Sequence, residues 1–195
     1  MKKHLFTAIR LFLILTTLTG IIYPLFVTVI SRFVFPLKSS GSLIVKENKI
    51  IGSALIGQKF TDNKYFWSRP SAVDYQPMPS GATNLAQSSS KLKNQYDERK
   101  SVFLEKNFLN SSSSIPLEML FSSASGVDPH ISPEAAFLQV ERVAKARNFT
   151  IDEKNSLNKL IESLIEKPQM GFLGQPVINV LLLNLKVDKM RNTNE

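Results

Sequence analysis

The chain has 195 residues, enough for one ordinary domain with an appendage. Hydrophobic residues make up 43% and charged residues 21%, which excludes both a disordered polyelectrolyte and a membrane protein with many spans. The absence of cysteine excludes disulfides, thiolate nucleophiles and cysteine-bound zinc, and the presence of only two histidines excludes a histidine-rich metal site.

The positive charge is unevenly distributed. A net charge of +8 and a pI of about 9.7 would suit a nucleic-acid-binding protein. However, residues 1–40 contain five basic and no acidic side chains, whereas the other 155 residues carry 19 basic and 16 acidic ones. Because much of the excess charge flanks one apolar stretch, we expect a membrane partner and no nucleic acid.

Residues 11–31 form an uncharged stretch of 21 residues between Arg10 and Arg32. At about 1.5 Å per residue, a helix of this length spans roughly 30 Å, the thickness of a hydrocarbon core. The stretch therefore predicts a transmembrane helix. Gly20 and Pro24 interrupt it, and membrane helices tolerate such residues where a neighbouring helix packs closely. Both are candidate interface residues.

A cleaved signal peptide is the alternative interpretation of this segment. The apolar run is longer than that of a usual signal peptide, and no small-x-small cleavage site follows, so we favour an uncleaved anchor. Lys2, Lys3 and Arg10 favour a cytoplasmic N-terminus, although Arg32 and Lys38 on the other side oppose this orientation. We expect a short cytoplasmic segment 1–10, a linker 32–42 and a single extracytoplasmic domain 43–195.

The first half of that domain predicts a hairpin, a long loop and a helix. Residues 43–45 and 49–56 are rich in β-formers around the polar stretch 46–48, which predicts a hairpin. Residues 60–81 are rich in aromatic residues, Pro and Ser and predict an ordered loop. Residues 85–110 predict a helix, and the serines 111–114 predict a variable loop.

The second half predicts two capped helices and a strand. Ser132, followed by Pro133 and Glu134, predicts a helix start. Thr150 with Glu153 predicts a capping box, and Pro168 should end the helix that follows. The apolar run 177–185 predicts a buried strand. Strands at both ends with helices between them predict an α+β fold.

Two motifs suggest chemistry and have simpler interpretations. Residues 52–59 resemble a phosphate-binding loop, but Gln58 and Lys59 stand where that motif needs Lys followed by Ser or Thr. Ser125, Asp128 and His130 supply the residue types of a catalytic triad within six positions. A turn whose short polar side chains bond nearby amides is the simpler interpretation of that segment.

The arginines have alternative interpretations. Trp67 and Arg69 lie in an aromatic segment that suits either a binding hot spot or a small core under the long loop. Arg142 and Arg147 follow the helix start at Ser132, and we interpret each as a surface or packing charge, with Arg142 pointing away from the apolar face.

Seven segments together resemble the KdpC family, one of the subunit families of the Kdp potassium-transporting ATPase, a bacterial inner-membrane complex. They extend in order over nearly the whole chain: 20–24, 52–58, 65–72, 80–85, 124–133, 142–147 and 174–180. Ala82 departs from the Gly or Ser frequent in that family and Val127 from its usual Leu, and the spacer 111–114 is variable.

The resemblance implies three partners: a channel-like potassium-binding subunit, a P-type subunit that hydrolyses ATP, and a small membrane subunit. This chain lacks the Asp-Lys-Thr-Gly phosphorylation motif, so we expect a non-catalytic subunit. Members of the family are described as catalytic chaperones that raise the ATP affinity of the hydrolysing subunit. A comparison with the signature of ABC transporters makes Ser80 and Gly81 candidates for nucleotide binding.

The expected topology conflicts with direct ATP contact, because ATP is cytoplasmic and the domain should lie outside. We therefore expect ATP to be used by the complex and no cofactor to be bound by this chain. Trp67, Arg69, Asp128 and His130 are its candidate interface residues. The alternatives are an anchored hydrolase using Ser125 and His130, and an anchored solute-binding domain using Trp67 and Arg69.

Overall fold

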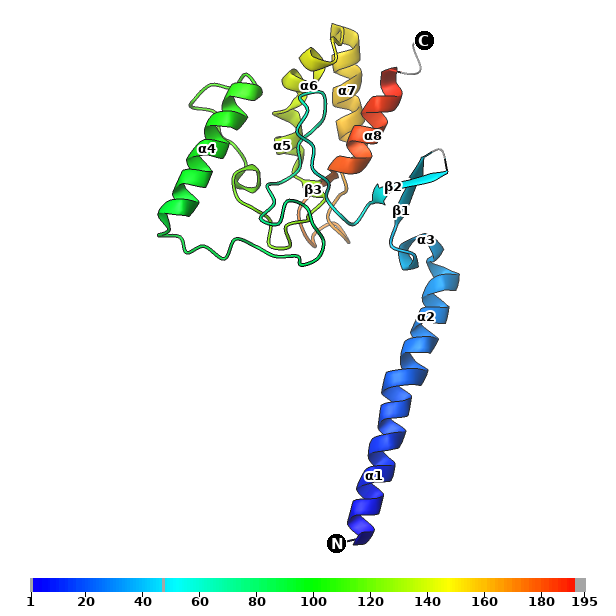
Figure 1. The fold of residues 1–195 in the computed structure, drawn as a ribbon. Coiled ribbons are helices and arrows are strands. Elements are labelled where there is room, and N and C mark those ends of the chain that lie inside the picture. The colour runs from blue at the N-terminus through cyan, green and yellow to red at the C-terminus, as the bar shows by residue number, and fades with distance from the viewer. Residues whose placement is uncertain (1, 47, 192–195) are drawn as a thin grey trace. The chain divides into compact units, whose positions relative to one another are not determined.

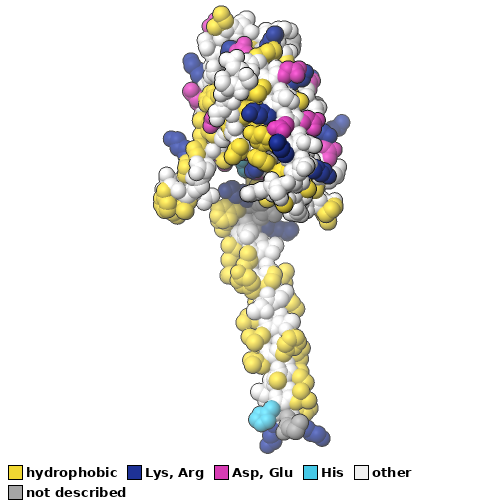
Figure 2. All heavy atoms as spheres, turned by 90° about the vertical axis from the view of Figure 1, so that its left-hand side faces the viewer, with side chains coloured by type: hydrophobic (Ala, Val, Ile, Leu, Met, Phe, Trp, Pro, Cys, Tyr) yellow, Lys and Arg dark blue, Asp and Glu magenta, His cyan; other side chains and the backbone are white. Residues whose placement is uncertain are grey.

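The computed structural model describes residues 2–46 and 48–191 (Figure 1). The chain divides into two compact units, Met1–Ser53 and Ala54–Glu195. It mixes helices with short strands, and the predicted α+β class with one long N-terminal apolar helix is confirmed. Figure 2 shows hydrophobic side chains along the helix of the first unit and charged side chains of both signs over the second unit.

The first unit begins with one continuous helix, Lys2–Val34, of 33 residues and mean hydropathy 2.1, which is long and apolar enough to cross a membrane. It consists of α1 (Lys2–Thr17), a π-helical turn η1 (Leu18–Ile22) and α2 (Tyr23–Val34). In the π-turn the Tyr23 amide donates to the carbonyl of Leu18, five residues back. Pro24 has no amide to donate to Gly20, and its ring would clash with that carbonyl in a regular helix, which accounts for the wider turn.

A short helix and a hairpin complete the first unit. Helix α3 (Pro36–Ser39) leads to β1 (Leu43–Lys46), which pairs antiparallel with β2 (Lys49–Ser53). Val45 lies opposite Ile50, and Lys46 lies opposite Lys49. The predicted hairpin is confirmed, although β2 ends at Ser53 and not at Ile56.

The second unit has mainly helices around one apolar core. In chain order its elements are α4 (Ser90–Lys106), the 3₁₀ turn η2 (Leu117–Met119), β3 (His130–Ile131), α5 (Pro133–Phe137), α6 (Val140–Ala146), α7 (Ile151–Ser163), β4 (Ile178–Asn179) and α8 (Val180–Arg191). Strands β3 and β4 pair antiparallel over two residues. The core includes Phe66, Phe103, Leu120, Ile131, Val143, Leu157, Ile161, Ile178, Leu183 and Val187.

The predicted helix starts are confirmed. The Ser132 hydroxyl accepts the Ala135 amide at 3.1 Å, and Thr150 and Glu153 form the reciprocal capping box. The predicted end of α7 at Pro168 is wrong, because the helix stops at Ser163. The chain is already extended at Glu166, whose amide donates to the Val177 carbonyl at 2.9 Å.

The predicted strand 177–185 is also wrong, since only Ile178–Asn179 is a strand and α8 begins at Val180. The Asn179 side-chain oxygen accepts the Leu182 amide at 3.1 Å, which caps this helix. Val180, Leu183 and Val187 are buried at helical spacing. An apolar run of this length fits a strand or a helix, and the cap determines which one forms.

Candidate functional site

The segment 60–81 has no helix or strand and is nevertheless fixed, as predicted for an ordered loop. Phe66 in this loop is 0% exposed. Its amide donates to the side-chain oxygen of Asn184 at 2.8 Å, and the Asn184 side-chain nitrogen donates to its carbonyl at 3.0 Å. One side-chain amide on α8 thus satisfies both backbone groups, as a neighbouring strand would.

Gln139, between α5 and α6, satisfies the next loop residue. Its side-chain oxygen accepts the Trp67 amide at 2.7 Å and an Nη2 hydrogen of Arg142 at 2.6 Å. Its side-chain nitrogen donates to the Ala135 carbonyl at 3.1 Å. Gln139 is fully buried, so these bonds replace the water that it would otherwise contact.

Arg142 on α6 fixes the loop through hydrogen bonds to its backbone. Its Nη1 donates to the carbonyls of Asn63 and Tyr65 at 2.6 and 2.9 Å, and its Nε donates to the Asn107 side chain at 2.9 Å. Its guanidinium carbon lies 4.0 Å from the centre of the Trp67 ring. The side chain is 2% exposed, and this burial lowers the pKa of Arg142 to about 10.

The interpretation of Arg142 as a surface charge pointing away from the apolar face is therefore wrong, and its interpretation as a packing charge is confirmed. Arg147 is also buried. Its Nε donates to the Lys64 carbonyl and its Nη2 to the carboxylate of Asp188, each at 2.7 Å. Its guanidinium also lies over the ring of Tyr65. The two arginines bind consecutive carbonyls of the loop.

Arg69 and Asp128 form an ion pair on the other side of the loop. The Arg69 Nη1 lies 2.7 Å from a carboxylate oxygen of Asp128, and the second oxygen accepts the His130 amide at 3.0 Å and lies 3.6 Å from the ring nitrogen Nδ1. Although burial alone would raise it, these hydrogen bonds lower the pKa of Asp128 to about 2. The bond with Asp128 in turn raises the pKa of His130.

The turn that contains Asp128 joins segments far apart in the sequence. The amide of Ser123 donates to Pro70, that of Gly81 to Ser125 and that of Gly57 to Val127, at 3.1, 3.0 and 2.7 Å. Gly126 has a φ of +72°, and a Cβ there would lie 2.5 Å from Val73 and 2.9 Å from the Gly81 carbonyl. Only glycine fits this close approach without strain.

Of the remaining predicted residues, Ser125 and Gly81 make hydrogen bonds within the second unit. The Ser125 hydroxyl accepts the Val127 amide at 3.2 Å, which is the bonding expected of a turn. Ser80 is exposed, and the Gly81 amide bonds to the Ser125 carbonyl. Both precede α4 by about nine residues, so neither lies at a helix start. A nucleotide-binding role for Ser80 and Gly81 stays a prediction.

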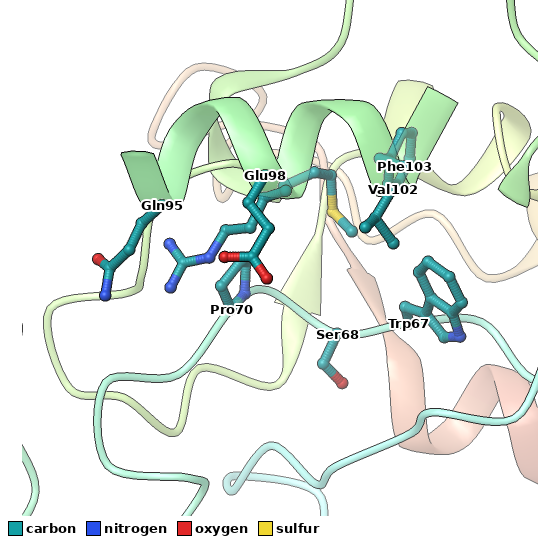
Figure 3. Close-up of a pocket in the computed structure, with 9 residues that line it drawn as sticks. Trp67, Ser68, Pro70, Gln95, Glu98, Val102 and Phe103 are labelled. Atoms are coloured by element: carbon teal, nitrogen blue, oxygen red, sulfur yellow. The ribbon is translucent and has the colours of Figure 1, made fainter. Parts of the chain in front are cut away.

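A pocket of about 390 Å³ lies between this loop and α4 (Figure 3). Trp67, Pro70 and Phe103 contribute apolar wall, and the carboxylate of Glu98 points toward the loop. A buried side-chain oxygen of Gln95, which also lines the pocket, has no hydrogen-bond partner within the described structure. In the part of the chain that the structure describes, no three His, Asp or Glu side chains are grouped to hold a metal ion.

A family model described as K+-transporting ATPase, c chain, matches residues 5–189. The chain belongs to the KdpC family. It is 47% identical over 181 residues to the potassium-transporting ATPase KdpC subunit of Leptospira interrogans, covering 93% of this chain and 91% of that one. It is 46% identical over 193 residues to the KdpC subunit of Geotalea uraniireducens, covering 96% and 98% of the two chains. The KdpC subunit of Shigella dysenteriae is 44% identical over 186 residues, covering 94% and 96%.

In this KdpC-family chain the structure brings together part of the predicted residue set. Arg69, Asp128 and His130 form one cluster, and Trp67 lies two residues from Arg69 on the same loop. Gly20 and Pro24 belong to the first unit, at the π-turn. An interface role for all six residues stays a prediction.

Three buried polar residues that help to fix the loop were missed. They are Asn107, Gln139 and Asn184, all buried and all bonded to the loop or to Arg142. Asn184 carried a usable signal, because it, like Asn179, is a polar residue within an apolar run. A polar side chain in such a run is buried only if it finds a partner.

Proposed function

We propose that this chain is a non-catalytic accessory subunit of an ATP-driven potassium importer. Its first helix would anchor it in the inner membrane with residues 1–10 in the cytoplasm, and residues 43–195 would lie outside. The observation that carries the proposal is that arginine side chains are used to fix the loop 60–81. Arg69, Arg142 and Arg147 are engaged in fixing the loop, which suits a rigid contact surface better than a reactive site.

The proposed partners are the three other subunits of the complex. Relatives that share more than two fifths of their residues with this chain are named as subunits of a potassium-transporting ATPase, which supports assembly into a complex of this kind. The partners that we propose within it are a channel-like subunit, a P-type hydrolysing subunit and a small membrane subunit. The π-turn around Gly20 and Pro24 would pack against a partner helix. The exposed parts of Trp67, Arg69, Asp128 and His130 would contact a partner outside the membrane.

The proposed effect on ATP is indirect. ATP is cytoplasmic, so an outer domain can change the ATP affinity of the hydrolysing subunit only through a coupling free energy transmitted by the membrane subunits. A coupling of this kind is typically about 1–3 kcal/mol, which corresponds to a change of roughly 5- to 150-fold in affinity. Within this proposal the chain raises that affinity and binds no ATP itself.

The test compares three complexes purified in mild detergent through a tag on the hydrolysing subunit. One contains the full chain, one contains only residues 1–53, and one lacks the chain. Subunit composition and the KM for ATP of potassium-stimulated hydrolysis are measured for each. We expect the complex without the chain to lose the channel-like subunit or its potassium stimulation, and the truncated chain to raise the KM for ATP at least about fivefold.

A matched pair of anchor variants separates assembly from folding. Gly20→Leu adds bulk at the π-turn and should reduce the amount of chain that co-purifies, whereas Ala8→Leu near the N-terminal end should not. Unchanged composition and an unchanged KM for ATP in the complex without the chain would reject the accessory role. Normal composition with an unchanged KM in the truncated complex would reject only the coupling.

One observation favours a second candidate, an anchored solute-binding domain. The pocket beside Trp67 has a volume of about 390 Å³, which suits a small molecule. Trp67 is the only tryptophan of the chain, so its fluorescence reports binding there directly. A ligand-dependent change that is abolished in Gln95→Ala would support this candidate, and a constant signal with every solute tested would reject it.

A further inference from the structure

The stretch directly after the uncharged part of the anchor combines basic and apolar side chains. Residues 32–53 contain four basic side chains, Arg32, Lys38, Lys46 and Lys49, and one acidic residue, Glu47, which lies outside the described residues. All four basic residues are exposed. This pairing of cations with apolar surface is typical of segments that lie in the headgroup region of a bilayer.

The hairpin shows the same combination at closer range. Val45 and Ile50 are neighbours across the two strands and are 59% and 65% exposed. Lys46 and Lys49, the next pair, lie directly opposite each other. Like charges in this arrangement repel, and two strands alone are only marginally stable in water. A bilayer surface would reduce the repulsion between the lysines through its negatively charged headgroups. Its apolar acyl chains would stabilise the hairpin by covering the apolar pair.

The hairpin is hydrogen-bonded to the short connection that follows the long helix. The Ser42 amide donates to the Leu37 carbonyl at 2.9 Å, and the Ser53 hydroxyl donates to the Gly41 carbonyl at 2.7 Å. Three large apolar side chains in the last turn of the helix and in the connection after it are also exposed, namely Phe33, Phe35 and Leu37. If the helix spans a membrane, this short connection keeps the hairpin close to the bilayer surface.

We propose that the β1–β2 hairpin is a membrane-surface element that binds anionic phospholipid headgroups. In this arrangement Val45 and Ile50 enter the boundary between headgroups and acyl chains. Lys46 and Lys49 extend their long stems so that their ammonium groups reach lipid phosphates.

Charge complementarity and chain continuity favour lipid over a protein partner as the occupant of this surface. The cations occur in the stretch that must lie next to the headgroups if residues 11–31 cross the bilayer. Each lysine near an anionic surface contributes about 1 kcal/mol of attraction, and the effect falls off within a Debye length. An anionic bilayer accounts for both the lysines and the apolar pair without a protein partner.

The test uses the native lack of cysteine. Val45→Cys in the full chain is labelled with an environment-sensitive fluorophore and reconstituted, together with its partner subunits, into phosphatidylcholine vesicles with or without phosphatidylglycerol. Lipids with a nitroxide near the headgroup act as quenchers. We expect a blue-shifted emission and strong quenching with phosphatidylglycerol, both weakened by salt. Lys46→Gln and Lys49→Gln should each weaken the association about fivefold, the factor that corresponds to 1 kcal/mol.

Ser112→Cys, in the exposed spacer of the second unit, is the matched control and should show neither effect. Quenching at Val45→Cys no stronger than at Ser112→Cys would overturn the proposal. A label that is buried but insensitive to lipid quenchers, or that cross-links to a partner subunit, would overturn it in favour of a protein interface.

The proposal rests on the membrane anchor. Extraction of the chain from the vesicles by alkaline carbonate would show that the anchor fails, whereas an integrated chain with an unquenched label shows that only the hairpin assignment fails.

Discussion

Regular secondary structure usually goes with burial in the protein, but in this chain the helix Lys2–Val34 and the loop 60–81 show the opposite. The helix satisfies its own backbone, yet none of its residues is buried within the protein. The loop has no regular structure, yet Phe66 is fully buried and the backbone of the loop is hydrogen-bonded by side chains from α6 and α8. The helix therefore depends on its surroundings, which a bilayer would supply, whereas the loop depends on a few named side chains.

This difference predicts that single substitutions act unequally on the two regions. Removing one side chain from the helix should change the stability of the helix only slightly, because its backbone hydrogen bonds remain. Removing one side chain that holds the loop leaves loop carbonyls or buried polar side chains without their partners, which costs about 1–3 kcal/mol for each group that is shielded from water.

The largest effect is expected for Arg142→Met. The substitution preserves much of the side-chain volume but leaves the carbonyls of Asn63 and Tyr65 and the side chain of Asn107 without their donor. We expect a loss of about 4 kcal/mol in the free energy of unfolding. Urea unfolding of the full chain in detergent, followed by Trp67 fluorescence, measures it.

Lys145→Met on the same helix is the control for Arg142→Met, because Lys145 is exposed. It should cost less than about 1 kcal/mol. Equal unfolding free energies for the two variants would show that the guanidinium does not hold the loop, and the contrast between loop and helix would then fail.

A smaller effect is expected for Gly126→Ala. The new Cβ would lie 2.5 Å from Val73, at a φ of +72° that is itself unfavourable for alanine. We expect a loss of about 3 kcal/mol from overpacking and backbone strain combined. Gly171→Ala is the control, since its φ is +84° but nothing lies within 4 Å of the added atom.

Gly171→Ala should lose only the backbone contribution, about 1 kcal/mol. The difference between the two glycine variants therefore isolates the close approach of the loop to the turn. Equal losses in the same urea measurement would indicate that the turn does not pack against the loop as described.

The smallest effect is the pH dependence of the Asp128–His130 pair. The pKa of Asp128 is lowered to about 2, so its contribution is present above about pH 4 and is lost as the pH falls toward 2. The pKa of His130 is raised, so its contribution is present below about pH 6.5 and is lost as the pH rises through the folded value. We expect less than about 1 kcal/mol from this partly exposed pair.

His130→Gln should abolish the alkaline part of that pH dependence and leave the acidic part, because Arg69 still bonds to Asp128. The free energy of unfolding, measured at steps of about one unit from about pH 2 to about pH 9, tests this. An alkaline loss of equal size in His130→Gln would assign the titration to another group.

The sequence predicted the elements whose signals are local. The hairpin around residues 46–48, the cap at Ser132 and the capping box of Thr150 depend on neighbours along the chain, and all three are confirmed. The strand at 177–185 was wrong because the capping role of Asn179 competes with an apolar run that suits either structure.

The contacts that fix the loop could not be predicted in the same way. Arg142 bonds to carbonyls 77 and 79 residues away, and Asn184 bonds to a residue 118 positions earlier. No local pattern states which distant carbonyl a buried side chain will meet. What the sequence did show was that the aromatic segment around Trp67 and Arg69 was unusual, and the structure places that segment in or against the core.

The account depends on the outer domain lying on the side of the membrane opposite to ATP. Ser112→Cys in an otherwise cysteine-free chain can be labelled with a membrane-impermeant maleimide in intact spheroplasts. We expect full labelling before the membrane is permeabilised. Labelling that requires permeabilisation would place residues 54–195 in the cytoplasm and would contradict the proposed action through neighbouring subunits.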